Sequence, residues 1–139
     1  MSRDEWMRFL TEGTRTAKLA TVRADGRPHV APVWFVVDGD SLVFMTLDTS
    51  VKGRNLQSEA RVMLSVDEET PPYSFVLIEG IAGVSRLSPQ ELLPWSRRIA
   101  DRYMAAEEAP AAADRNAVEG ELLVRVPFTK VIAAKGVAS

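Results

Sequence analysis

The stretch that decides the fold is Tyr73-Ser74-Phe75-Val76-Leu77-Ile78-Glu79-Gly80-Ile81-Ala82-Gly83-Val84-Ser85-Arg86-Leu87, the longest strand pattern in the chain. Both of its faces are apolar. One carries Tyr73, Phe75, Leu77 and Ile81, and the other carries Val76, Ile78, Ala82 and Val84. A small antiparallel barrel covers only one face of a strand, so we expect a helix or a second subunit to cover the other. Gly80 and Gly83 predict sharp bending, as at a barrel corner.

Shorter strand patterns lie on both sides of this run. They cover residues 14–23, 28–37, 41–47 and 61–67 before it, and 121–126 and 128–135 after it. Asp25-Gly26 and Asp38-Gly39 are typical of tight hairpin turns, which predicts antiparallel pairing of the first three strands. Pro32 removes a backbone donor in the middle of the second strand, which indicates an edge strand, a bulge or a ligand beside the backbone.

Two capping boxes predict helices, one at Ser2 with Glu5 and one at Ser88 with Glu91. The second helix places Leu92, Trp95, Ile99 and Tyr103 on one side, with Arg97, Arg98, Asp101 and Arg102 mostly outward. Residues 104–117 are rich in alanine and are helical or loosely ordered, with no function indicated. The expected fold is mainly β, a small antiparallel β-barrel with flanking helices, in a single domain covering residues 1–139. Neither the alternation of a Rossmann sheet nor Gly-x-Gly-x-x-Gly occurs, which argues against a nicotinamide site of that kind.

The composition excludes several classes of site. The chain has 139 residues, 46% of them hydrophobic and 26% charged, with a net charge of −2, so we expect neither nucleic acid nor a membrane as a partner. It contains no cysteine and one histidine, His29, so no metal site is expected. No signal peptide is recognisable, and the longest run free of polar residues, 30–37, is too short to span a bilayer. We therefore expect a cytoplasmic protein.

An anion-binding turn is indicated at Thr49-Ser50-Val51-Lys52-Gly53-Arg54-Asn55-Leu56, between two strand patterns. Thr49 and Ser50 stand where a short helix would begin, and Lys52 and Arg54 follow within its first turn. Unpaired N–H groups at a helix start, an ammonium and a guanidinium suit a phosphate, and Gly53 lets the backbone come close. A solvated Lys/Arg pair beside a helix cap is the alternative reading of the same residues.

Several segments, in their order and spacing, resemble the pyridoxamine 5′-phosphate oxidase-like split β-barrel superfamily. They are Ala17-Lys18-Leu19-Ala20-Thr21-Val22, Asp25-Gly26-Arg27-Pro28-His29-Val30-Ala31-Pro32-Val33-Trp34-Phe35, Val51-Lys52-Gly53-Arg54-Asn55-Leu56, Arg61-Val62 and Glu79-Gly80. Within this superfamily the chain is most similar to the flavin/deazaflavin oxidoreductases that use coenzyme F420. The resemblance extends over nearly the whole chain.

The resemblance implies a split barrel, a homodimer and one cofactor groove per subunit at the interface. It implies that Lys52, Arg54 and Asn55 hold the cofactor phosphate, with Thr49 and Ser50 as helpers. It also implies that the strand with Ala31, Pro32, Val33 and Trp34 lies along the tricyclic ring, which explains Pro32. Lys18 is either solvated or reaches the acidic tail of the cofactor, and Arg97, Arg98 and Arg102 are further cations available for that tail.

The activity implied by the resemblance is hydride transfer between a reduced deazaflavin, coenzyme F420, and a small conjugated substrate of the enone or quinone kind. Two alternatives stay open: an FMN-binding oxidase or reductase on the same barrel, and a protein that binds a cofactor or pigment without turnover. No acid–base residue is assigned. Histidine is a common acid–base residue, but no carboxylate lies near His29 in the sequence, so its simplest interpretation is a strand residue at a turn.

Overall fold

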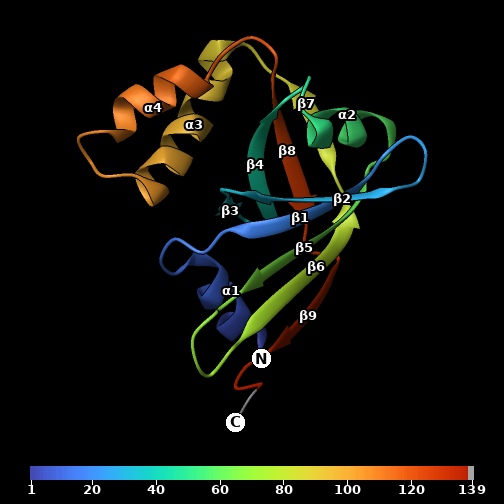
Figure 1. The fold of residues 1–139 in the computed structure, drawn as a ribbon. Helices are drawn as coiled ribbons and strands as arrows, with labels where there is room; N and C mark the ends of the chain where they lie inside the picture. Colours follow the sequence, from blue (N-terminus) through green and yellow to red (C-terminus); the bar gives the residue numbers. More distant parts are fainter. Residues whose placement is uncertain (138–139) are drawn as a thin grey trace.

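In the computed structural model, which describes residues 1–137, nine strands form two antiparallel sheets (Figure 1). The five-stranded sheet has the order β2-β1-β5-β6-β9, with β1 (Ala17–Val22), β2 (Pro28–Val33), β5 (Arg61–Asp67), β6 (Phe75–Ile81) and β9 (Lys130–Ala134). The four-stranded sheet has the order β3-β4-β8-β7, with β3 (Val36–Asp38), β4 (Ser41–Leu47), β8 (Glu121–Pro127) and β7 (Gly83–Arg86). The two sheets form a split β-barrel, as predicted, and β2 is an edge strand, which accommodates Pro32.

The expected single strand over residues 28–37 is wrong, because the chain leaves one sheet after Val33 and enters the other at Val36. At the link, the Phe35 N–H donates to the Tyr103 hydroxyl and the Phe35 carbonyl accepts from Arg102. Side chains of a helix therefore satisfy the backbone where it has no neighbouring strand.

The long run 73–87 also passes between the sheets, and here the prediction of a bend is confirmed. β6 ends at Ile81 and β7 begins at Gly83. A Cβ on Gly80 would lie 3.2 Å from the Pro127 carbonyl oxygen, so the absence of a side chain at Gly80 lets the two segments cross closely.

The main core fills the space between the two sheets and is closed at one end by α1 (Arg3–Thr11). Inward-facing residues of both sheets alternate with outward ones. The fully buried members include Leu19, Leu42, Phe44, Leu64, Ile78, Leu122 and Val124. Helix α1 adds Trp6, Phe9 and Leu10, and it begins at the predicted capping box of Ser2 and Glu5.

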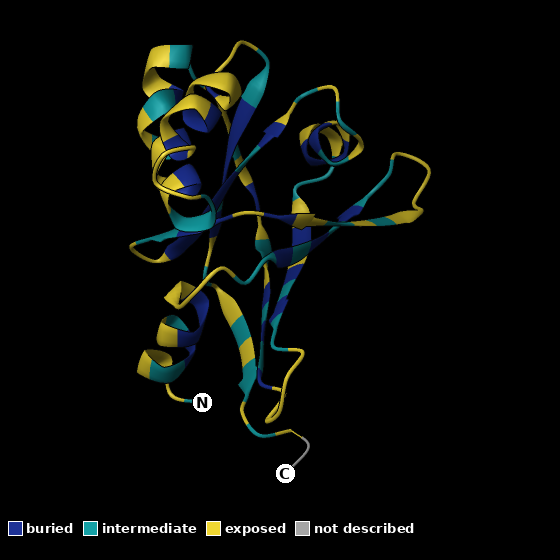
Figure 2. Ribbon diagram, turned by 60° about the vertical axis from the view of Figure 1, so that its left-hand side comes forward, coloured by how far each residue is buried: buried dark blue, intermediate teal, exposed yellow. Residues whose placement is uncertain are grey.

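A second core lies on the outer face of the four-stranded sheet, where α3 (Pro89–Tyr103) packs with α4 (Ala109–Asn116) beside it. Val43 and Leu123 of the sheet meet Leu92 and Ile99 of α3. Buried residues of α3 face the sheet, and those of α4 pack against α3 (Figure 2). The strand buried on both faces is therefore β4, whose outer face is covered by a helix.

The outer face of the five-stranded sheet, by contrast, is left partly open in the single chain. Ile81 is 65% exposed, although the sequence predicts a cover over this side of the run, and Tyr73, in the turn before β6, is 42% exposed. No cover is formed by α3 or α4, because α3 contacts the other sheet and α4 packs against α3. Within residues 1–137, no helix combines the length and hydropathy needed to cross a bilayer.

Candidate functional site

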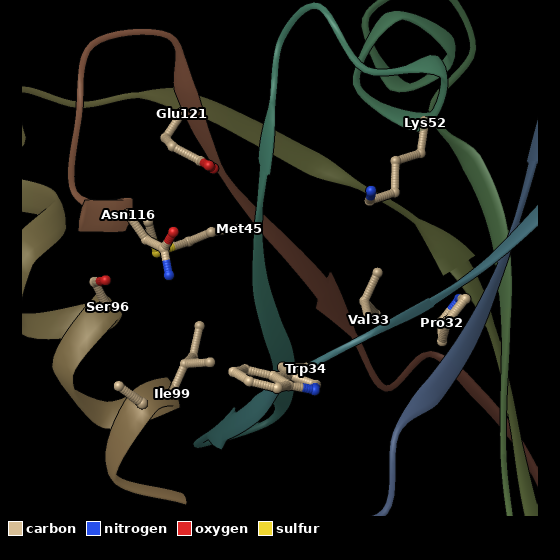
Figure 3. Close-up of a pocket in the computed structure, with 10 residues that line it drawn as sticks. Pro32, Val33, Trp34, Met45, Lys52, Ser96, Ile99, Asn116 and Glu121 are labelled. Carbon is tan, nitrogen blue, oxygen red and sulfur yellow. The ribbon is translucent and has the colours of Figure 1, made fainter. Parts of the chain in front are cut away.

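A pocket of about 230 Å³ opens where the end of β2, β4, the start of α2 (Val51–Ser58), α3 and the start of β8 meet. We call it the groove. It is lined by Pro32, Val33, Trp34, Met45, Lys52, Ser96, Ile99, Ala100, Asn116 and Glu121. Figure 3 shows the Lys52 ammonium and the Glu121 carboxyl pointing into the same space from opposite sides of β4. A lining that combines apolar side chains with converging polar groups is consistent with a small-molecule site.

One wall of the groove is a fixed aromatic pair. The Trp34 ring stacks on the Tyr103 ring at 5.0 Å with an interplanar angle of 5°. The Tyr103 hydroxyl donates to the Arg15 carbonyl at 2.8 Å and accepts from the Phe35 N–H at 3.2 Å. Burial raises the pKa of Tyr103, which keeps the hydroxyl protonated as a donor. Since Trp34 is 43% exposed, part of its surface is available to a ligand.

Lys52 supplies the cation of the groove. It lies in the first turn of α2, which begins one residue after its cap, Ser50. Within residues 1–137 its ammonium has no hydrogen bond and no ion pair, so it can take an anion without losing a protein partner. The predicted helix start at the hydroxyl residues is therefore confirmed, and Lys52 lies in the first turn of that helix, as predicted.

Arg54 does not join Lys52 in the groove. Residues two apart on a helix do not share a face. Arg54 instead lines a separate hollow of about 400 Å³ on the other side of α2, together with Arg23 and Arg27 of the β1–β2 hairpin. The structure thus separates the two cations that the sequence reading placed on one phosphate.

Gly53 and Asn55 position α2 within the protein. A Cβ on Gly53 would lie 2.0 Å from the Leu47 carbonyl oxygen, so the close approach that Gly53 permits is to the end of β4. The Asn55 amide is buried and donates to the Thr21 hydroxyl on β1 at 3.0 Å. The side-chain amide that the resemblance assigns to the cofactor phosphate therefore already holds the helix on the sheet.

Ser50 is also engaged within the protein. Its hydroxyl donates to the Leu47 carbonyl at 2.7 Å and accepts from the Gly53 N–H at 3.0 Å. Thr49, the other expected helper, is exposed in the preceding turn. Of the two hydroxyls, only that of Thr49 remains without an internal bond in the described part of the chain.

Two further expected contacts lie away from the lining of the groove. Ala31 pairs with Leu19 in the β1–β2 ladder and is half-buried, while the neighbouring Pro32 and Val33 do reach the groove. The Lys18 ammonium forms an ion pair with Asp67 at 2.9 Å. Lys18 therefore has a partner on β5 and is not a free cation beside the groove.

Arg102 was expected outward, and this is wrong. Its guanidinium donates to the carbonyls of Leu10 at 2.7 Å, Phe35 at 2.8 Å and Gly13 at 3.0 Å. Burial lowers the pKa of Arg102, which nonetheless stays a cation at any physiological pH.

Arg98, on the same helix, is tied to β3. It forms an ion pair with Asp38 at 3.2 Å and donates to the Val37 carbonyl at 3.0 Å. Of the three helix cations considered for a cofactor tail, only Arg97 has no partner among residues 1–137.

The sequence reading missed Glu121 and Asn116. Glu121 begins β8, and its Oε2 is buried without a hydrogen-bond partner in the described residues. Burial raises the pKa of Glu121, an effect that Asp48 strengthens and Lys52 opposes. Asn116 ends α4, in the alanine-rich segment to which no function was assigned. An acidic residue at the edge of an apolar strand pattern is common, so only the three-dimensional arrangement reveals that it enters the groove.

Comparisons with known proteins agree with this architecture. Residues 3–125 match the pyridoxamine 5′-phosphate oxidase family, which is most of the chain. The chain therefore belongs to the pyridoxamine 5′-phosphate oxidase family. No curated protein matches it.

Solved structures share the fold. An F420 reductase is 26% identical, over 90% of this chain and 94% of that one, with a TM-score of 0.71. A conserved hypothetical protein from Mycobacterium tuberculosis is 23% identical over 99% and 86%, with a TM-score of 0.76. HutZ, the heme storage protein from Vibrio cholerae, is 18% identical over 97% and 96%, with a TM-score of 0.74. The last two likenesses concern the fold alone.

Proposed function

We propose that the protein is an oxidoreductase that binds coenzyme F420 in the groove and passes hydride to a small conjugated substrate of the enone or quinone kind. The observation that carries this proposal is the combination of an unpaired ammonium, Lys52, and a fixed aromatic wall, Trp34, in one pocket. The likeness to an F420 reductase, at 26% identity over 90% of the chain, supports the choice of cofactor.

The residues present fit a phosphate-bearing tricyclic cofactor. Lys52 would bind the phosphate as a point charge, and Pro32 and Val33 would lie along the ring with Trp34 as the wall. The cofactor, when bound, supplies the hydride chemistry. The chain would orient it, and the apolar residues of the lining, including Met45 and Ile99, would contact the ring.

We also propose that two copies of the chain assemble. The groove, at about 230 Å³, is smaller than the roughly 300–1,000 Å³ of typical ligand pockets, which a second chain would enlarge. The outer face of the five-stranded sheet carries the apolar side chains that such a contact would bury. They are Val30, Met63, Ile81 and Ile132.

Sedimentation tests this assembly. Ile81→Glu should give a monomer, since a charge in an apolar interface is costly, while Ala111→Glu on the exposed side of α4 should leave the dimer intact. A wild-type protein that stays monomeric at high concentration with its cofactor bound would contradict the proposal.

The cofactor is tested by parallel equilibrium titrations of the purified protein with coenzyme F420 and with FMN. We expect tighter binding of coenzyme F420 at low salt, and a larger loss with added salt than for FMN, because its acidic tail meets exposed cations that are screened within about 8–10 Å. Tighter binding of FMN, which presents the same phosphate to Lys52, would replace coenzyme F420 with FMN in the proposal.

A turnover assay separates an enzyme from a carrier. Oxidation of the reduced deazaflavin by a quinone such as menadione, in the presence of catalytic amounts of protein, is the expected result. Stoichiometric binding without any acceleration over the uncatalysed reaction would favour a protein that stores its cofactor.

A further inference from the structure

Glu121 is the acidic group of the groove, and its surroundings leave one of its oxygens unsatisfied. It is held at the start of β8, where it pairs in register with Leu47 of β4, and the preceding Gly120 carbonyl accepts from the Asp48 N–H at 2.8 Å. The carboxyl points into the groove (Figure 3), and its buried Oε2 has no hydrogen-bond partner among residues 1–137. A buried acceptor without a donor costs free energy, which a hydrogen bond to a ligand would recover, either from a donor on the ligand or from the protonated carboxyl to an acceptor on it.

Charged groups reach Glu121 from two neighbouring elements. Lys52, from α2, is the cation that favours its ionised form, and Asp48, from the turn before α2, is the anion that opposes it. Asp48 forms an ion pair with Arg86 of β7 at 2.7 Å, so the positive charge of that arginine is directed to Asp48. Asn116, from α4, and Ser96, from α3, line the same groove and are neutral. The ionised form of Glu121 thus depends on Lys52.

We propose that Glu121 takes up a proton from solvent when an anion binds Lys52, and that the resulting carboxylic acid faces the bound ligand as a hydrogen-bond donor. An anion at Lys52 neutralises the cation that holds Glu121 ionised and adds a negative charge to the groove. Protonation removes this repulsion and gives the unsatisfied carboxyl a hydrogen to donate. The proposal rests on the proposed function insofar as the anion is the cofactor phosphate.

As a consequence, the affinity for the anion depends on pH through the ionisation of Glu121. Binding of the anion raises the pKa of Glu121. The affinity for the anion is therefore highest at a pH below the pKa of Glu121 in the free protein, and it falls as the pH rises toward the pKa of Glu121 in the complex. Between the two values the slope approaches about tenfold per pH unit, the limit for one proton. Glu121→Gln, which is neutral at every pH and keeps the shape of the side chain, should remove this dependence.

Calorimetric titration with coenzyme F420, in two buffers of different ionisation enthalpy at the same pH, counts the protons taken up. The phosphate of this cofactor is a diester and does not itself titrate near neutrality, unlike that of FMN. We expect the wild type to take up a substantial fraction of one proton and Glu121→Gln close to none. Glu119→Gln, at an exposed position two residues earlier, should behave as the wild type.

The environment of Glu121 can also be tested without cofactor, by thermal unfolding. Because the pKa of Glu121 is raised in the folded protein, the carboxyl stabilises the fold most at acid pH, and this contribution is lost as pH rises through the folded value. The melting temperature of Glu121→Gln relative to the wild type should therefore increase with pH and then level off. A difference that stays constant with pH would overturn the proposal.

The outcomes separate the two proposals. Cofactor binding with no proton uptake, or with equal uptake by Glu121→Gln, overturns the role of Glu121 and leaves the proposed function standing. If neither coenzyme F420 nor FMN binds, the proposed function fails, and the same proton count with sulfate, an anion that does not titrate near neutrality, decides the role of Glu121. Uptake that Lys52→Met abolishes would support it, and binding of sulfate at Lys52 without uptake would overturn it.

Discussion

Each side of α2 carries one cation, and the two cations have different surroundings. Lys52 faces a groove with the Trp34 wall and the unsatisfied Glu121 carboxyl, whereas Arg54 faces a hollow beside the exposed tip of the β1–β2 hairpin. Neither cation has a side-chain partner in the described chain, so the absence of a partner does not distinguish them. What distinguishes them is the surface that each side of the helix meets. An anion site is therefore defined by the residues that lie opposite the cation.

Gly53→Ala should alter both sides of α2, because it removes the close contact that places the helix against the end of β4. The added Cβ would overlap the Leu47 carbonyl oxygen, so α2 has to move away from β4. We expect a loss of about 3 kcal/mol in the free energy of unfolding, at the upper end for overpacking, together with loss of cofactor binding. Urea unfolding measures the first effect. Gly83→Ala, whose Cβ would have an ordinary 3.6 Å contact, is the control.

Lys52→Met tests the groove side alone. Removing the ammonium should weaken cofactor binding by about 1.5–3 kcal/mol, the range for a hydrogen bond to a charged group. Stability should hardly change, since the ammonium bonds no other group of residues 1–137. Equilibrium titration with coenzyme F420 measures the effect, and unaltered affinity would show that the groove is not the phosphate site.

Asn55→Ala tests whether the helix is held by its buried amide. The Thr21 hydroxyl would lose the donor that it has at 3.0 Å, at a cost of about 1–3 kcal/mol in the free energy of unfolding. Thr49→Ala in the exposed turn is a matched control and should be neutral. Adding Thr21→Val should recover part of the loss, because then neither partner is left unsatisfied. No change in the single variant would mean that Asn55 serves the ligand and not the fold.

Arg54→Met should have the smallest effect. An exposed charge outside the groove contributes about 0–1 kcal/mol to binding, and this contribution should vanish at high salt. The measurement is the same titration at low and high ionic strength. If this variant weakens binding as much as Lys52→Met, both cations act on one anion and the difference between the two sides of α2 is wrong.

Much of the fold could be predicted from local patterns. The Asp25-Gly26 and Asp38-Gly39 turns, the two capping boxes and the glycines at the corner of the run 73–87 each depend on a few neighbouring residues, and each is found where expected. The break at Trp34 and Phe35 could not be predicted in this way. Apolar residues continue through it, and the partners of its backbone, Arg102 and Tyr103, lie far along the chain.

The site was predictable only in part. Lys52, Pro32, Val33 and Trp34 reach the groove as expected. The separation of Lys52 from Arg54 follows from helical periodicity, because two residues that are two positions apart on a helix lie on different faces. Glu121 has no local signal, because the cation that shares the groove with it, Lys52 of α2, lies far from it in the sequence. The role of a charged residue at the end of a strand depends on the elements that pack against it in the folded protein.

The three hydrogen bonds from Arg102 to backbone carbonyls affect which segments of the protein unfold together. One side chain of α3 holds the end of α1, the loop after it and the link between the sheets, across 92, 89 and 67 residues of sequence. Detaching α3 would leave three carbonyls unpaired at once, so these segments should open in hydrogen exchange as one cooperative unit. The aromatic wall of the groove, anchored by the adjacent Tyr103, is expected to lose its support in the same opening.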